Sequence, residues 1–99
     1  MAKIGQKLAR NKLAVNKFLH GNPIVLVYDC VGKGKEEVST YDRIKLKISL
    51  KTAAKRMGIP MQNINEVQYN YNALNLESTA LENNIPNGGV LTIKIKSIF

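Results

Sequence analysis

Cysteine, histidine and tryptophan are nearly missing from this sequence, which contains Cys30, His20 and no tryptophan. A single cysteine excludes an internal disulfide, and a single histidine excludes zinc sites that need two cysteines and two histidines, as well as the HExxH helix of metalloproteases. No apolar run approaches the roughly 18 residues that span a bilayer. The longest apolar stretch near the N-terminus, residues 13–15, is too short for a signal-peptide core. We expect no cofactor or metal, and a location in the cytoplasm or in a particle assembled there.

Acidic residues are scarce as well. Seven Asp and Glu residues stand against fifteen Lys and Arg residues, which gives a net charge of +8. Such a surplus favours an acidic partner, whether nucleic acid, anionic lipid or the acidic face of a protein. The length of 99 residues and the hydrophobic content of 44% are those of one globular domain with a modest core. A large catalytic cleft between two domains is therefore excluded.

Residues 1–20 contain no acidic residue and differ in character from the rest. Their basic residues are Lys3, Lys7, Arg10, Lys12 and Lys17. Their larger apolar residues recur with the period of a helix and are Ile4, Leu8, Val15, Phe18 and Leu19. Gly21 and Pro23 follow in the order typical of a helix end. The pattern predicts a basic amphipathic helix over residues 1–20, ahead of a domain over residues 21–99.

The domain begins with a β-branched apolar run at residues 24–28, which predicts a strand buried on both faces. The glycine-rich segment 31–35 is expected to reverse the chain. Residues 43–48 then alternate between basic and apolar side chains, which predicts a second strand. Its inward residues would be Ile44, Leu46 and Ile48.

A short helix is predicted over residues 50–57, with Ser49 as its cap and Leu50, Ala54 and Met57 on one face. Gly58-Ile59-Pro60 is expected to end it.

The last third of the chain predicts two more strands. The first runs through residues 67–71, with Tyr69 and Tyr71 inward, and a helical turn follows at residues 78–83. A turn at residues 86–89 leads into the final strand, whose inward residues would be Leu91, Ile93 and Ile95. The order of elements predicts an α+β domain with one helix across a mixed sheet.

This order is similar to that of the ubiquitin family. The residues that resemble the second half of ubiquitin are Gly58-Ile59-Pro60, Gln62, Val67-Gln68-Tyr69, Leu76, Thr79, Leu81, Asn84-Ile85 and Leu91-Thr92-Ile93. Residues 84–91 also resemble the turn before the last strand in YukD-type proteins, the small ubiquitin-like proteins of bacterial type VII secretion systems. The resemblance covers residues 23–96. It implies a ubiquitin-like β-grasp fold, a mixed four- to five-stranded sheet with one helix across it, preceded here by the N-terminal amphipathic helix.

Departures from the family change the expected role. Conjugated ubiquitin-like modifiers and sulfur carriers end in Gly-Gly, whereas this chain ends in Ser97-Ile98-Phe99 and its Gly88-Gly89 precedes the last strand. We therefore expect neither conjugation nor sulfur transfer. Polar residues fall where ubiquitin carries its apolar recognition patch, namely Gln68, Thr92 and Lys94. Ordinary ubiquitin receptors are not expected to bind.

The basic helix over residues 1–20 is open to three interpretations: a solvated face docked on its own domain, a contact to another protein, or a contact to nucleic acid or anionic lipid. The predicted strand at residues 24–28 bears on the first two. A β-grasp helix covers one face of the sheet, so Val25 and Val27 on the outer face need a cover. Either residues 1–20 or a partner protein could supply it.

A second basic cluster consists of Arg43, Lys45, Lys47, Lys51, Lys55 and Arg56, with Lys94 and Lys96 on the last strand. The residues expected to share the outer sheet face with Val25 and Val27 are Lys45, Lys47, Lys94 and Lys96. They would be either ordinary solvated positions or a groove that follows a phosphate backbone. Aromatic residues for base stacking are few, and Tyr69 and Tyr71 are expected to face inward.

No combination of residues indicates catalysis. The Gly32-Lys33-Gly34-Lys35 segment lacks the spacing of a phosphate-binding loop and is typical of a turn. Asp29 next to Cys30 would raise the thiol pKa rather than activate the thiol. His20 lies where an imidazole would cap a helix. We expect a protein that is not an enzyme and has no small-molecule substrate.

The sequence thus predicts a non-catalytic ubiquitin-like binding or assembly module. It would dock on a partner protein or a larger particle through its basic N-terminal helix and its sheet face. A subunit of a bacterial secretion apparatus and a component of a phage-type particle both fit. The alternative is a small basic nucleic-acid-binding protein, whose binding would weaken steeply with salt.

Overall fold

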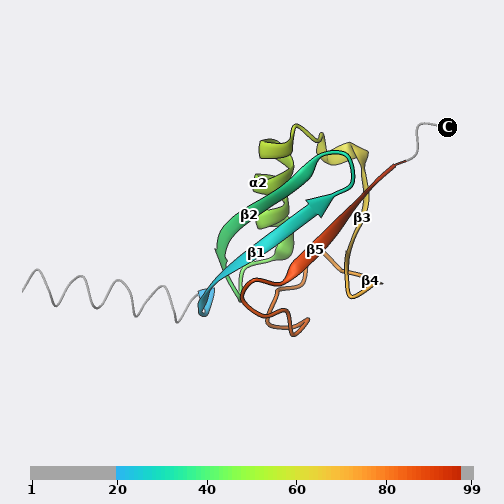
Figure 1. Cartoon of the computed structure of the whole chain (residues 1–99). Coiled ribbons are helices and arrows are strands. Elements are labelled where there is room, and N and C mark those ends of the chain that lie inside the picture. The colour runs from blue at the N-terminus through green and yellow to red at the C-terminus, as the bar shows by residue number, and fades with distance from the viewer. Residues whose placement is uncertain (1–19, 97–99) are drawn as a thin grey trace, which may run out of the picture.

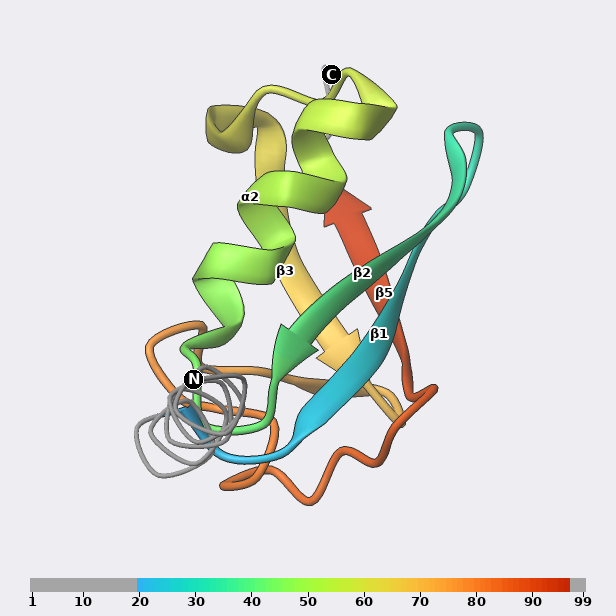
Figure 2. The same ribbon diagram turned by 90° about the vertical axis from the view of Figure 1, so that its left-hand side faces the viewer.

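The computed structural model describes residues 20–96 (Figure 1). Its elements are the strands β1 (Pro23–Cys30), β2 (Gly34–Tyr41), β3 (Ile64–Tyr69), β4 (Asn72–Ala73) and β5 (Val90–Ile95), the helix α2 (Leu46–Met57) and the 3₁₀ turn η1 (Met61–Asn63). The strands form one mixed sheet of five strands in the order β2-β1-β5-β3-β4. Helix α2 lies across one face of the sheet (Figure 2). The predicted β-grasp fold is confirmed. The helix predicted for residues 1–20 lies outside the described residues, except for His20.

Strand β1 is an interior strand of the sheet, as its apolar sequence predicts. It pairs antiparallel with β2 and parallel with β5. Leu26 and Tyr28 point inward and are fully buried against the core, while Val25 and Val27 point to the outer face and are half-buried. Because side chains alternate along a strand, one apolar run supplies both faces of the sheet.

The second strand of the hairpin is β2, at residues 34–41, and the prediction of a strand over residues 43–48 is wrong. Gly32 and Gly34 have φ of 83° and 100°, and Lys33 N–H donates to the Cys30 carbonyl at 3.0 Å. This tight turn returns the chain at once, so β2 starts at Gly34.

Residues 46–48 instead begin α2. Leu46 is buried there, Ile44 precedes the helix and is half-buried, and Ile48 is 52% exposed. Apolar residues at every second position are typical of a strand. The same residues also fit a helix when another apolar residue follows four positions later, as Leu50 follows Leu46. Ser49 therefore lies inside α2 and does not cap it.

The predicted end of the helix is confirmed. Gly58 follows Met57 with φ of 71°. Its N–H donates to the Lys55 carbonyl at 3.2 Å, and the N–H of Ile59 donates to the Ala54 carbonyl at 2.8 Å. These bonds satisfy carbonyls that the end of a helix leaves free, and the left-handed conformation favours glycine at this position.

Strands β3 and β4 are joined by a two-residue turn in which Asn70 and Tyr71 both have positive φ, 50° and 68°. This is the backbone of a type I′ hairpin turn. Tyr69 packs partly against the core, but Tyr71 is 96% exposed, so the prediction that it faces inward is wrong. The strand ends at Tyr69 because the turn reverses the chain before the alternation can continue.

The segment before β5 contains the predicted turns. Thr79 and Glu82 exchange hydrogen bonds of 3.1 and 3.2 Å, as in a capping box, and Gly89 N–H donates to the Pro86 carbonyl at 2.9 Å. In β5 the inward residues Leu91 and Ile93 are buried as predicted. The expected inward residue Ile95, at the end of the strand, is 37% exposed.

Candidate partner-binding surfaces

The outer face of the sheet carries apolar side chains at its centre. Val27 on β1 lies opposite Val90 on β5, and Val25, two residues before Val27, is on the same face. Val90 is 46% exposed, whereas Val25 and Val27 are half-buried. Helix α2 lies on the other face of the sheet (Figure 2). The sequence missed Val90 as a surface residue, although its position just before the inward residue Leu91 indicates it.

A shallow hollow of about 270 Å³ lies at Val90. It is lined by Gln68, Asn70, Tyr71, Val90, Thr92 and Lys94. Three of these residues, Gln68, Thr92 and Lys94, occupy the outer face of β3 and β5, as the resemblance to ubiquitin implied. The exposed ring of Tyr71 stands beside them on the hairpin turn. The lining of this hollow therefore combines apolar, aromatic and amide groups with one cation.

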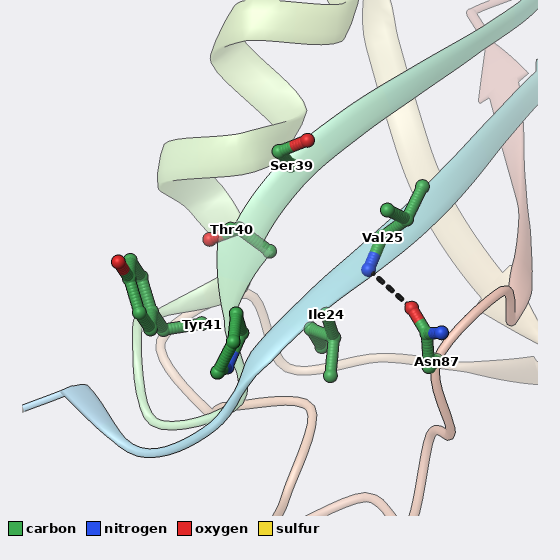
Figure 3. Close-up of a pocket in the computed structure, with 7 residues that line it drawn as sticks. Ile24, Val25, Ser39, Thr40, Tyr41 and Asn87 are labelled. Atoms are coloured by element: carbon green, nitrogen blue, oxygen red, sulfur yellow. Dashed lines mark hydrogen bonds between the residues drawn. The ribbon is translucent and has the colours of Figure 1, made fainter. Parts of the chain in front are cut away.

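A second hollow, of about 350 Å³, lies where β1 begins (Figure 3). Its lining includes Ile24, Val25, Thr40, Tyr41 and Asn87. The side-chain oxygen of Asn87 accepts a hydrogen bond of 2.7 Å from the Val25 N–H, so this amide is committed to holding the loop before β5 against β1. The hollow is shallow and has no titratable group other than Tyr41.

The join between residues 1–20 and the domain is held by Asp42. The Asp42 carboxylate accepts from Asn22 N–H at 2.9 Å, and Asp42 N–H donates to the Asn22 carbonyl at 2.9 Å. The next residue, Arg43, donates its N–H to the His20 carbonyl at 2.8 Å. The rings of His20 and Tyr41 have centroids 5.9 Å apart. Sequence patterns gave no signal for this clamp, because it joins residues twenty positions apart.

The expected grouping of four lysines on the outer sheet face is wrong. Lys45 directly precedes α2 and Lys47 belongs to α2, where both pair with the Glu77 carboxylate at 3.0 and 2.9 Å. Hydrogen bonds from Lys47 and then Lys45 lower the pKa of Glu77. Of the remaining two, Lys94 is on the outer face of β5, opposite Glu66, and Lys96 follows the strand.

The cationic side chains around α2 form a different surface. Lys47, Lys51 and Lys55 recur at intervals of four residues on the helix, and Arg56 adjoins them. The helix contains no Asp or Glu residue. Side chains four residues apart lie on one face of a helix, so these lysines line up along it. The sequence placed them in one cluster but did not predict their shared face.

The cysteine thiol and the acidic side chains are not arranged for catalysis or for metal binding within the described residues. Burial raises the pKa of the Cys30 thiol, with Lys33 opposing and Asp29 reinforcing the change, as the sequence predicted. Cys30 is only 2% exposed. Within residues 20–96, no three Asp, Glu, His or Cys side chains are grouped so that they could hold a metal ion. In that same part of the chain, no helix has the length and apolarity needed to cross a membrane.

No protein-family model and no curated protein matches this sequence. Solved structures do match. A de novo designed protein based on ubiquitin superposes with a TM-score of 0.62 and 23% identity, covering 79% of this chain and 94% of its own. The N-terminal ubiquitin-like domain in the 4931431F19Rik protein superposes with a TM-score of 0.65 and 10% identity, covering 79% of each chain. Together with the sheet order and α2, these likenesses establish a ubiquitin-like β-grasp fold.

Proposed function

We propose that this protein is a non-catalytic ubiquitin-like module that binds a partner protein or a larger assembly. Its binding surfaces are the apolar side chains of residues 1–20 and the outer face of the sheet around Val27, Val90 and Tyr71. The division into a helix over residues 1–20 and a domain over residues 21–99 is part of the proposal. The observation that carries it is the conformation and exposure of Tyr71.

Tyr71 occupies a position that folding alone would give to glycine. A type I′ turn needs positive φ at both central residues, and Asn-Gly is its preferred sequence. Here the pair is Asn70-Tyr71, with φ of 68° at the tyrosine. The ring is 96% exposed and so contributes little to the core. Backbone strain of this kind is concentrated at functional sites, and tyrosine is among the residues enriched in protein interfaces.

The surroundings of Tyr71 support a protein partner. Apolar area is available at Val90, while Gln68 and Thr92 supply polar groups beside it. An apolar centre with a polar rim is the usual composition of a protein interface. The resemblance of residues 84–91 to YukD-type proteins supports a role in a secretion apparatus, and a phage-type particle in the cytoplasm fits the same surfaces.

Photo-crosslinking tests this function. A photoreactive amino acid at position 90 in the full-length protein reports contacts of the outer face, and the same group at Thr52 on α2 is the control. We expect position 90 to capture a defined protein that position 52 does not. The captured protein is then purified, and its Kd is measured against wild type and Tyr71→Gly.

The affinity measurement decides the outcome. We expect Tyr71→Gly to weaken binding about tenfold or more, as loss of an interface aromatic does, while Thr52→Ala leaves it unchanged. Moderate salt should change the affinity little, because apolar burial is barely screened. A partner whose affinity is the same for wild type and Tyr71→Gly would contradict the proposed surface.

A further inference from the structure

The charges of the domain are distributed unevenly between its two faces. The outer sheet face carries Asp29, Glu37 and Glu66 together with Lys35 and Lys94, a near balance. On the opposite face, the charged side chains of α2 are all basic, namely Lys47, Lys51, Lys55 and Arg56. The acidic residues on this side include Glu36, which lies opposite the inward-facing Tyr28, and Glu77, which pairs with Lys45 and Lys47.

The lysines of α2 are neutralised at one end only. The ion pairs among residues 20–96 are those of Lys45 and Lys47 with Glu77. Like charges four residues apart destabilise a helix, and Lys51 follows Lys47 and precedes Lys55 at this spacing. A helix that only had to be solvated would tolerate glutamates among these positions. Arg56 donates to the backbone carbonyl of Glu37 at 3.0 Å, which extends the basic surface toward β2.

The most basic part of the sequence joins the domain next to this surface. Arg43 and Lys45 directly precede α2, and Arg43 N–H is bonded to the His20 carbonyl at 2.8 Å. The first described residue, His20, is thus bonded to the loop that leads into α2. Residues 1–20 precede this point in the sequence and contain five further basic residues and no acidic one.

We propose that the exposed face of α2, together with Arg43, binds the phosphate backbone of nucleic acid. A row of cationic side chains is complementary to nucleic acid, which carries one negative charge at each phosphate. Contacts to the phosphates do not depend on the base sequence. A protein partner fits this face less well, because the cores of protein interfaces are depleted in lysine. A membrane surface also fits less well, because a helix that lies on a membrane needs an apolar face and Ile48 is the only exposed apolar residue of α2.

This surface goes beyond the proposed protein contact. The outer face of the sheet and α2 lie on opposite sides of the domain, so one copy could hold a nucleic acid and a protein at once. No aromatic side chain lies on α2 for base stacking. Binding is therefore expected to be sequence-independent, and double-stranded and single-stranded oligonucleotides both serve as probes.

Fluorescence anisotropy with labelled oligonucleotides of about 20 nucleotides tests the proposal, at about 50 and 200 mM salt. The full-length wild type is compared with Lys51→Gln/Lys55→Gln. The matched control is Lys35→Gln/Lys94→Gln, which removes the same charge from the outer face. All four side chains are exposed, so both variants should fold, and thermal unfolding followed by circular dichroism checks this.

We expect the α2 variant to bind about tenfold more weakly at low salt and to reduce the slope of log K against log salt by about 1.8 on duplex DNA, roughly 0.9 for each lost phosphate contact. The control variant should change the affinity much less. Tyr71→Gly should leave oligonucleotide binding unchanged, which separates this surface from the proposed protein-binding face.

Several results would overturn the proposal. Equal losses in the two double variants would mean that net charge alone governs binding. Competition by poly-glutamate as effective as that by unlabelled oligonucleotide would assign the surface to an acidic protein. Equal binding to vesicles of anionic lipid would assign it to a membrane. Lack of binding at the lower salt concentration would leave α2 as a solvated helix.

Discussion

The hydroxyl of Tyr28 lies 2.6 Å from Oγ of Ser49 and thereby ties strand β1 to helix α2 across the core. Both side chains are buried, and the Ser49 hydroxyl also donates to the Leu46 carbonyl at 3.1 Å. Burial raises the pKa of Tyr28 to about 12, and the hydrogen bond with Ser49 opposes this rise. The phenol is therefore neutral under ordinary conditions and positions α2 relative to β1.

Replacing Tyr28 by Phe should destabilise the fold by about 1 kcal/mol, because the hydroxyl is lost while Ser49 keeps its bond to Leu46. Urea unfolding of the two proteins measures the difference. Tyr71→Phe is the control, since the Tyr71 ring is exposed and its hydroxyl is not part of the core. An unfolding midpoint unchanged by Tyr28→Phe would mean that the hydrogen bond does not stabilise the domain.

The sequence predicted the fold better than the location of each element. The apolar run of β1, the alternation of β5 and the glycine turn after α2 all act locally, so their patterns were enough. Strand β2 gave no such signal. It is an edge strand, pairs on one side only and buries Val38 alone, so its sequence contains little apolar periodicity. Residues 43–48 imitated a strand more closely.

The candidate surfaces were only partly predictable. The sequence showed that the basic residues around α2 form a cluster. It did not show that they lie on a different face from Lys94, because that depends on Lys45 and Lys47 lying at the start of a helix and not in a strand. The exposure of Tyr71 depended on where β3 stops. The flanking asparagines Asn70 and Asn72 were the available signal, because asparagine tolerates the left-handed conformation of a tight turn.

Gly21→Ala is expected to destabilise the domain at its join to residues 1–20. Gly21 has φ of 84°, and a β-carbon there would overlap the Asp42 carboxylate that accepts from Asn22. The left-handed conformation alone costs about 1–2 kcal/mol for a residue with a side chain. Displacing Asp42 also costs the hydrogen bond from the partly buried Asn22 N–H, so the total should reach about 3 kcal/mol.

Gly32→Ala provides the comparison for this clamp. Gly32 has nearly the same φ, 83°, but no atom lies within 4 Å of a β-carbon placed there. We expect only the conformational cost of about 1–2 kcal/mol at this position. Chemical unfolding of both variants gives the difference. Equal destabilisation would show that the contact with Asp42 contributes nothing.

Tyr71→Gly should stabilise the domain by about 0.5–1 kcal/mol. It removes the strain of a left-handed tyrosine and creates the Asn-Gly pair preferred in type I′ turns, and the greater freedom of glycine in the unfolded chain offsets part of the gain. Thermal unfolding measures the shift, and Tyr71→Ala is the matched control because it removes the ring and keeps the β-carbon. If Tyr71→Gly were less stable than wild type, the ring would contribute to folding and the case for a binding role would weaken.

The Glu77 ion pairs make a small, pH-dependent contribution to stability. Hydrogen bonds from Lys47 and Lys45 lower the pKa of Glu77 below its usual 4.5, so the folded state favours the ionised form. The stabilisation is present above that value and is lost as the pH falls through the pKa of the folded state. The side chains are about half exposed, so the effect is small and screened by salt.

Glu77→Gln should therefore lower Tm slightly at neutral pH, and the difference from wild type should vanish in acid. The same substitution in a Lys45→Gln/Lys47→Gln background should have no effect on Tm. A difference that stays constant as the pH is lowered would mean that the carboxylate stabilises the fold by some means other than its charge.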